Sequence, residues 1–141
     1  MRKTKEKAMK ALATLLCACM MLAMVACFGP KTVEEAFSMP EVQEEMQRLC
    51  DEFESENSDY IKSVDFEIEG NSIIFRAHCL QNFEELKPAE VTYLDDMFVT
   101  IMKTEAEELR EMIDIEGEIR IGVYMYNADG SVYYSKDMNF Y

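Results

Sequence analysis

Histidine and glycine are scarce in this sequence, which has one histidine, His78, and five glycines among 141 residues. A Gly-rich loop that wraps a phosphate needs several glycines close together, and the sequence has no such loop. No serine lies in the pattern of a nucleophile elbow. No CxxC or Cys/His spacing indicates zinc. The familiar signatures of nucleotide-binding, serine-hydrolase and zinc proteins are therefore missing.

Positive charge is also in short supply, with 14 basic against 28 acidic residues and a formal charge of −14. Residues 1–26 hold five of the basic residues and one acidic residue, so the other 115 residues carry a formal charge of −18. Such a chain repels phosphate backbones and anionic lipid headgroups, so nucleic-acid binding is not expected. Two interpretations of the charge stay open: solubility of an extracytoplasmic protein, or electrostatic recruitment of a cationic partner.

The first 26 residues have the layout of a secretory signal. Residues 1–10 contain the five basic residues, and residues 11–26 contain no charged residue. A basic region followed by an apolar region is typical of a signal peptide, which is removed from the mature protein. The apolar run of 16 residues is shorter than the roughly 20 that span a bilayer. A lipoprotein-type signal peptide is expected at 1–26, with an uncleaved membrane anchor as the alternative.

The apolar run ends at Cys27, directly after the small residues Val25 and Ala26. This context resembles the lipobox of bacterial lipoproteins, in which the cysteine becomes the first mature residue. The resemblance implies that the Cys27 thiolate takes a diacylglyceryl group and that residues 27–31 form the lipidated cysteine and a tether. Each buried methylene contributes about 0.8 kcal/mol, so two acyl chains such as palmitate suffice for stable attachment. The alternative is cleavage elsewhere in the leader.

Cys50 and Cys79 are the two cysteines beyond Cys27. Outside the cytoplasm, an even pair of cysteines favours a disulfide. Two buried thiols are the alternative, because an unpaired cysteine behaves as a small apolar residue. Both alternatives stay open.

A first amphipathic helix is predicted over about residues 39–55. Thr32–Glu35 and Ser38–Glu41 both match the capping-box pattern of a helix start. Pro40 is tolerated in the first turn. Apolar residues then recur at helical spacing, at Val42, Met46, Leu49, Cys50 and Phe53.

A second helix is predicted after Pro88, over about residues 89–113. Its apolar stripe consists of Val91, Leu94, Phe98, Ile101, Met102, Leu109 and Met112. Acidic residues are expected on the opposite side, at Glu105, Glu107, Glu108 and Glu111. This helix therefore also has one face to bury.

A hairpin is predicted between the two helices. Gly70-Asn71 fits a two-residue turn, and folding back over it pairs residue 68 with 73, 66 with 75 and 64 with 77. Asp65 then lies opposite Arg76 as a cross-strand ion pair. The same register places Cys79 on the core side, where the helix with Cys50 must also pack.

A second hairpin is predicted at the end of the chain. Ile119, Ile121, Val123 and Met125 alternate on one strand, and Val132, Tyr134, Met138 and Phe140 on the next. A two-residue or a four-residue loop within Asn127–Gly130 keeps both apolar sets on one face. The order α-β-β-α-β-β predicts a single α+β domain over residues 32–141, with a four-stranded antiparallel sheet and two helices packed on one face.

A family resemblance is carried by the lipobox-like Cys27, by KTVEEAFSMPEVQEEM at residues 31–46 and by NADGSVYYSKDM at residues 127–138. These segments resemble a family of small, uncharacterised lipoproteins of Gram-positive bacteria. The similarity covers nearly the whole chain from Lys31 to Phe140. The family has no established function, so the resemblance implies no catalytic residues.

Sites for chemistry are few. The hairpin register places His78 on the outer sheet face, opposite Ser63, where it is expected to be a surface residue. Acidic pairs are numerous in so acidic a chain, and none stands out as an acid and a base. Asn127 and Asp129 lack the further ligands of a calcium loop, and a tight turn explains them. No cofactor and no metal site is predicted.

One surface is a candidate binding face. Opposite the core, the last two strands present Arg120, Tyr124, Tyr126 and Tyr133, with Tyr141 at the edge. Tyrosine and arginine are enriched in protein interfaces, because they combine a large contact area with a polar tip. Ordinary packing of tyrosines on a solvated sheet face is the alternative.

The sequence thus predicts a lipoprotein that is not an enzyme, anchored in the outer leaflet of a bacterial cell membrane and facing outside. Its domain is expected to bind a protein or peptide partner, or to serve an envelope role with an unknown ligand. The alternative function is a small envelope hydrolase whose site is assembled from carboxylates.

Overall fold

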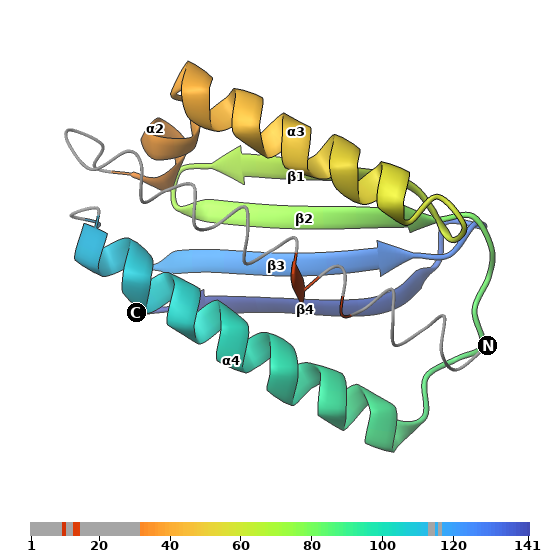
Figure 1. Ribbon diagram of the computed structural model, residues 1–141. Helices are drawn as coiled ribbons and strands as arrows, with labels where there is room; N and C mark the ends of the chain where they lie inside the picture. Colours follow the sequence, from red (N-terminus) through yellow and green to blue (C-terminus); the bar gives the residue numbers. More distant parts are fainter. Residues whose placement is uncertain (1–9, 11–12, 15–31, 113–114, 116) are drawn as a thin grey trace.

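The computed structural model describes residues 10, 13–14, 32–112, 115 and 117–141 (Figure 1). The predicted signal peptide, apart from three residues, and the tether at 27–31 lie outside the described residues. The helices are α2 (Val33–Phe37), α3 (Pro40–Glu56) and α4 (Pro88–Met112), and the strands are β1 (Ile61–Glu69), β2 (Ser72–Cys79), β3 (Ile119–Tyr126) and β4 (Val132–Phe140). The predicted α+β class is confirmed.

The four strands form one mixed sheet in the order β1-β2-β3-β4. β1 pairs with β2 and β3 pairs with β4 in antiparallel fashion, as each hairpin requires. The two central strands, β2 and β3, are parallel. The prediction of an all-antiparallel sheet is therefore wrong at the one junction between the hairpins.

The long helix α4 explains the parallel junction. It has 25 residues and is therefore about 37 Å long, enough to run the full length of the sheet. The chain leaves β2 at one end of the sheet, returns along α4 and enters β3 at the end where β2 began (Figure 1). A helical crossover of this length joins parallel neighbours.

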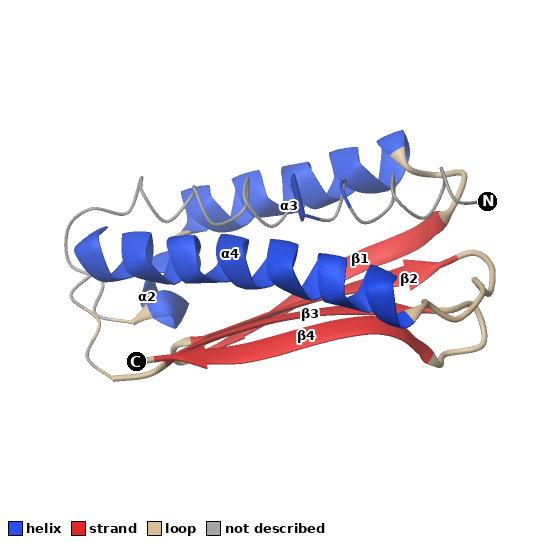
Figure 2. Cartoon of the chain, turned by 90° about the horizontal axis from the view of Figure 1, so that it is seen from below, coloured by secondary structure: helices blue, strands red, loops and turns tan. Residues whose placement is uncertain are grey.

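The sheet and the helices form two layers, with α3 and α4 on the same side of the sheet (Figure 2). α3 packs over β1, whereas α4 packs over β4 and β3. One hydrophobic core lies between the layers, and its fully buried side chains include Met46, Ile73, Phe75, Phe98, Met102, Ile121 and Met125. Ala13, from the N-terminal segment, is 6% exposed and belongs to this core.

The first hairpin has the predicted register. Ile68 pairs with Ile73, Phe66 with Phe75 and Val64 with Ala77. Gly70 adopts a positive φ of 57°, which a residue without Cβ reaches at no steric cost. The Gly70-Asn71 turn and the alternation of apolar and polar residues are both local features, so the sequence was sufficient to predict this register.

The second hairpin differs from the expectation near its turn. A bulge between Met125 and Tyr126 pairs Met125 with Tyr134 but Tyr126 with Val132. Val132 is therefore 52% exposed instead of lying with the core set. The rest of the strand keeps the predicted apolar face, because Ile121 pairs with Met138.

α2 is fastened to the first hairpin turn. Its N-cap is Thr32, whose side chain accepts a hydrogen bond from the Glu35 N–H, as the first capping pattern predicts. Glu34 N–H donates to the Gly70 carbonyl at 2.8 Å, and Gly70 N–H donates to the Glu34 carboxylate at 2.7 Å. The side-chain oxygen of Asn71 accepts a hydrogen bond from the Val33 N–H. The backbone carbonyl of Asn71 accepts another from the Arg120 N–H at the start of β3. One turn thus holds α2 and the start of β3 together.

The second capping pattern does not cap α3. The Ser38 hydroxyl donates to the Glu34 carbonyl at 2.5 Å, so it closes the end of α2. The N-cap of α3 is Met39, which makes no side-chain capping bond, and Pro40 occupies the first turn as predicted.

Glu105 is buried, contrary to the expected exposed side of α4. Glu105 is 8% exposed. It lies three residues after the buried Met102 and four residues before the buried Leu109. Residues at these spacings share one helix side. Burial, with the charge of Glu108 as a smaller cause, raises the pKa of Glu105 to about 7.

Candidate binding site on the open sheet face

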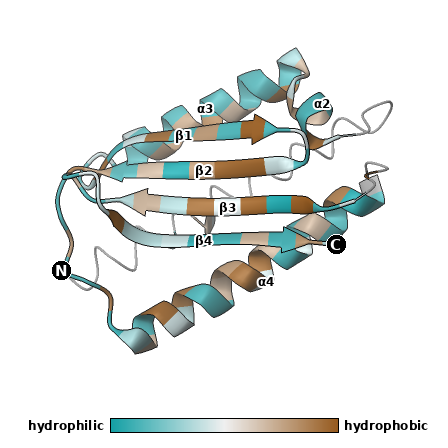
Figure 3. Cartoon of the chain, turned by 180° about the vertical axis from the view of Figure 1, so that it is seen from behind, coloured by the Kyte–Doolittle hydropathy of each residue, from teal (hydrophilic) through white to brown (hydrophobic). Residues whose placement is uncertain are grey.

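The face of the sheet that looks away from the helices carries side chains from all four strands. Figure 3 views this face, with the described helices behind the sheet. The strand registers align these residues in four rows, Glu69-Ser72-Arg120-Asn139, Glu67-Ile74-Gly122-Asp137, Asp65-Arg76-Tyr124-Ser135 and Ser63-His78-Tyr126-Val132. The parallel pairing of β2 and β3 brings His78 beside Tyr126 and Arg76 beside Tyr124. An antiparallel pairing would have reversed that order along β3.

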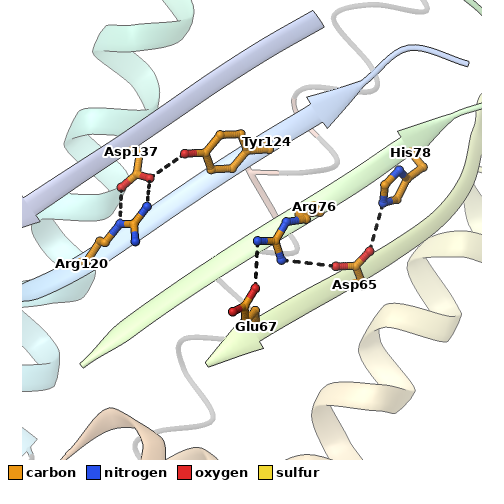
Figure 4. Close-up of polar contacts among 7 residues, drawn as sticks. All are labelled: Asp65, Glu67, Arg76, His78, Arg120, Tyr124 and Asp137. Carbon is orange, nitrogen blue, oxygen red and sulfur yellow. Dashed lines mark hydrogen bonds and ion pairs between the residues drawn. The ribbon is translucent and has the colours of Figure 1, made fainter. Parts of the chain in front are cut away.

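Asp137 holds two predicted site residues in place. Arg120 donates from Nε to Oδ1 at 2.9 Å and from Nη2 to Oδ2 at 2.5 Å (Figure 4). The Tyr124 hydroxyl donates to Oδ2 at 2.6 Å. The hydrogen bonds from Arg120 lower the pKa of Asp137, and the hydrogen bond to Asp137 raises the pKa of Tyr124. The carboxylate therefore stays ionised, and the three side chains are fixed relative to one another.

Arg76 organises a second polar group beside the first. Its Nη2 lies 2.9 Å from Glu67 Oε2, and its Nη1 lies 3.7 Å from Asp65 Oδ1. Burial lowers the pKa of Arg76, but the hydrogen bond and charge of Glu67 outweigh it and raise that pKa overall. The predicted cross-strand pair between Asp65 and Arg76 is therefore confirmed, and Glu67 joins it (Figure 4).

His78 lies on the outer face as predicted. Its Nε2 is 3.0 Å from Asp65 Oδ2, and its ring stacks on Tyr126 with centroids 5.1 Å apart and planes 13° apart. The Tyr126 ring in turn stacks with the Tyr124 ring, with their centroids 6.3 Å apart and their planes 12° apart. Three rings with nearly parallel planes thus cross the two central strands, in a stacked geometry that aromatic pairs favour.

A hollow of about 320 Å³ opens between these groups. It is lined by Glu67, Glu69, Ser72, Ile74, Arg76, Arg120, Tyr124 and Tyr126. Gly122 is covered by two of these lining side chains, because a Cβ there would lie 2.7 Å from Ile74 Cδ1 and 3.3 Å from Tyr124 Cε2. The absence of a side chain at Gly122 lets the Tyr124 ring lie across β3 and reach Asp137.

Three of the four candidate binding residues come together on this face: Arg120, Tyr124 and Tyr126. Tyr133 does not join them. It packs against Phe83 with ring centroids 5.3 Å apart, at the bulged end of β4. Burial raises the pKa of Tyr133 to about 12. Tyr141 is 91% exposed at the C-terminus.

Cys50 and Cys79 are both buried thiols, 1% and 2% exposed, on α3 and β2. Burial raises the pKa of Cys79 to about 11, so its thiol stays protonated at neutral pH. Their joining in a disulfide remains a prediction. Cys27, the predicted lipidation site, lies outside the described residues.

Asp137 and Arg76 are site residues that the predicted binding face does not include. Asp137 is one of 28 acidic residues, and no local sequence motif distinguishes it from the others. Its distinguishing feature is its position opposite Gly122 in the sheet. The sequence left the loop of the second hairpin open, so this partner could not be assigned. Arg76 is predicted in an ion pair, but the sequence predicts no specific pairing between the two hairpins, so its neighbour Tyr124 could not be assigned.

In the part of the chain that the structure describes, no group of three or more His, Cys, Asp or Glu side chains could hold a metal ion. Among the helices described, none is both long enough and apolar enough to cross a membrane.

Comparison with known proteins identifies the family. Residues 33–138 match the model of a domain of unknown function, DUF4854, and this chain belongs to that family. The match begins at α2 and ends within β4, so it covers β1, β2, β3 and most of β4. The resemblance to an uncharacterised family is thereby confirmed at the level of the domain. No curated protein and no solved structure matches the chain significantly.

Proposed function

We propose that this protein is a bacterial lipoprotein, tethered through Cys27 to the outer leaflet of the cell membrane, whose domain is a non-enzymatic binding module. The lipobox-like sequence supports the anchor. The observation that carries the binding role is the array of Arg120, Tyr124 and Asp137, fixed by mutual hydrogen bonds on the open sheet face. Side chains that are already ordered lose little conformational entropy when a ligand binds.

The state of the carboxylates favours binding over the alternative of a hydrolase. A carboxylic acid that donates a proton needs a pKa raised toward the working pH. The pKa of Asp137 is lowered by Arg120, and Glu67 and Asp65 are engaged by Arg76. Among the described residues, the carboxyl with a raised pKa is Glu105, which belongs to α4 in the other layer of the molecule.

A partner for the open face is expected to be a protein, a peptide or another envelope component. Tyrosine and arginine are the residue types that protein interfaces enrich. Both residue types occur on the open face, where Arg76, Arg120, Tyr124 and Tyr126 line one hollow.

The anchor is tested by mass spectrometry of the N-terminus of protein purified from membranes. We expect the chain to start at Cys27 with a diacylglyceryl adduct. The Cys27→Ser variant should lack the adduct and leave the membrane fraction. An unmodified Cys27, or a start at another residue, would contradict the anchor.

The binding face is tested by cross-linking intact cells and identifying what the protein captures. We expect Tyr124→Ser and Tyr126→Ser to lose a captured component that the wild-type protein retains. Tyr93→Ser is the matched control, because Tyr93 is 59% exposed on α4 and belongs to the other layer. Captured components that are identical in all variants would show that the face is not used.

A further inference from the structure

The hollow beside Gly122 has the chemistry of a site for an uncharged ligand. Two carboxylates, Glu67 and Glu69, and two guanidinium groups, Arg76 and Arg120, line it. An anionic ligand meets both carboxylates and a chain of net charge −14. A cationic ligand meets both guanidinium groups. A ligand without net charge avoids both repulsions.

The lining groups also have complementary hydrogen-bonding capacities. Carboxylates only accept and guanidinium groups only donate, whereas the hydroxyl groups of Ser72 and Tyr126 do both. Glu67 is held by Arg76, and Arg120 is held by Asp137. Among the described residues Glu69 makes no ion pair, so its acceptor oxygens remain available. A ligand with adjacent hydroxyl groups, each a donor and an acceptor, fits such a lining.

The tyrosine rings supply a surface for the apolar part of that ligand. Tyr124 and Tyr126 both line the hollow, and their ring planes lie within 12° of each other. The face of an aromatic ring carries a negative quadrupole, which attracts the slightly positive C–H groups of a sugar ring. A saccharide combines such C–H groups with a rim of hydroxyls in one rigid unit.

We propose that the hollow between β1, β2 and β3 binds a neutral saccharide, as one or two sugar units of an envelope glycan. This assignment rests on the proposed binding role of the open face and names the ligand class. The volume of about 320 Å³ lies at the small end of the range for ligand sites, in keeping with a short saccharide segment. Tyr124 is the stacking residue, Arg120 and Glu69 bind hydroxyl groups, and Gly122 leaves the space that the Ile74 and Tyr124 side chains occupy.

The test uses the full-length protein in a detergent without a sugar headgroup. Maltotriose, cellotriose and tri-N-acetylchitotriose are titrated by calorimetry and by ligand-detected NMR. We expect saturable binding of at least one of them, with an affinity that is nearly constant from about 50 to 500 mM NaCl because no charge is exchanged. Trigalacturonate and trilysine serve as the anionic and cationic comparisons, and we expect neither to bind saturably.

Three variants locate the bound sugar. Tyr124→Ser and Gly122→Val should each weaken binding by about tenfold or more, the first by removing the ring and the second by displacing the Ile74 and Tyr124 side chains that line the hollow. Glu69→Gln should weaken it several-fold, and it leaves the fold intact because Glu69 is exposed and makes no ion pair in the described chain. Tyr93→Ser, on α4, should bind like the wild-type protein.

Four results would overturn the saccharide assignment. These are no saturable binding of any neutral trisaccharide, binding that Tyr124→Ser leaves unchanged, binding that Glu69→Gln leaves unchanged, or binding of trilysine or trigalacturonate that Glu69→Gln abolishes. If saccharide binding fails but capture in cells still depends on Tyr124, the binding face stands and only the ligand class is wrong. If capture is also independent of Tyr124, the proposed binding role falls with it.

Discussion

Asp137 is the residue on which the order of the open face depends. It accepts hydrogen bonds from Arg120 and Tyr124, and its side chain is 23% exposed. Charge-assisted hydrogen bonds of this kind are stronger than neutral ones. Without the carboxylate, the guanidinium and the phenol ring would regain rotational freedom above Gly122.

The change Asp137→Asn should lower the free energy of unfolding by about 1–2 kcal/mol at neutral pH, measured by urea denaturation. The pKa of Asp137 is lowered in the folded protein, so its contribution is present above the unfolded value of about 3.8 and is lost as pH falls through the folded value. The difference between variant and wild type should therefore narrow below about pH 3.8. Asn139→Ala, an exposed change on the same strand, is the control and should be nearly neutral. A gap that does not depend on pH would contradict the role of the charge.

At the scale of the elements, the sequence predicted the parts better than their assembly. Both hairpins and both amphipathic helices depend on neighbours in the chain, such as the turn at Gly70-Asn71 and the alternation of Val64, Phe66 and Ile68. The junction of β2 with β3 depends on where α4 delivers the chain, which no local pattern reports. The position of Tyr133 was missed for a similar reason, because a bulge shifts the strand without a clear sequence signal.

α4 is joined to the edge strand β4 at both ends of the strand. The Tyr134 hydroxyl donates to Asp95 Oδ1 at 2.9 Å, near the start of α4. Arg110, near the end of α4, donates to the Phe140 carbonyl at 2.8 Å and to the Gly117 carbonyl at 2.5 Å. These bonds satisfy polar groups that an edge strand would otherwise leave to solvent.

The change Tyr134→Phe should therefore cost about 1 kcal/mol of unfolding free energy, because the Asp95 carboxylate loses a donor in a partly buried place. The lower stability is measured as a lower midpoint of urea denaturation, with an unchanged dependence of the unfolding free energy on urea concentration. Tyr93→Phe is the control, because it also removes a tyrosine hydroxyl but at an exposed position on α4. It should leave the urea midpoint unchanged. Equal midpoints for both variants would mean that the bond to Asp95 contributes nothing to stability.

At the scale of the whole molecule, the acidic composition extends into the core: among the described residues, the Glu105 carboxyl is buried. Glu105 is 8% exposed, and burial raises its pKa to about 7 from an ordinary value of 4.5. A carboxyl whose pKa is raised on folding favours the folded state only while it is protonated. As pH rises from about 4.5 to 7, the unfolded chain loses this proton first and the protein becomes less stable.

The change Glu105→Gln removes this penalty. We expect the full-length variant to be more stable than the wild-type protein above about pH 7, by at most about 3 kcal/mol, with the difference shrinking toward pH 4.5. Guanidinium unfolding at a series of pH values measures it. Glu107→Gln, an exposed change two residues along α4, controls for the loss of one charge. A difference of the same size at every pH would show that Glu105 is ionised throughout.

The fastening of α2 to the first turn has a mechanical consequence. A pull on the chain ahead of Thr32 would pass through α2 into Gly70 and Asn71, which bond Glu34 and Val33. Asn71 also bonds Arg120, so the load would spread at once from one hairpin to the other instead of peeling β1 from the edge of the sheet. For the lipid-tethered protein that we propose, a pull from the N-terminal side would therefore leave the geometry of the open face intact.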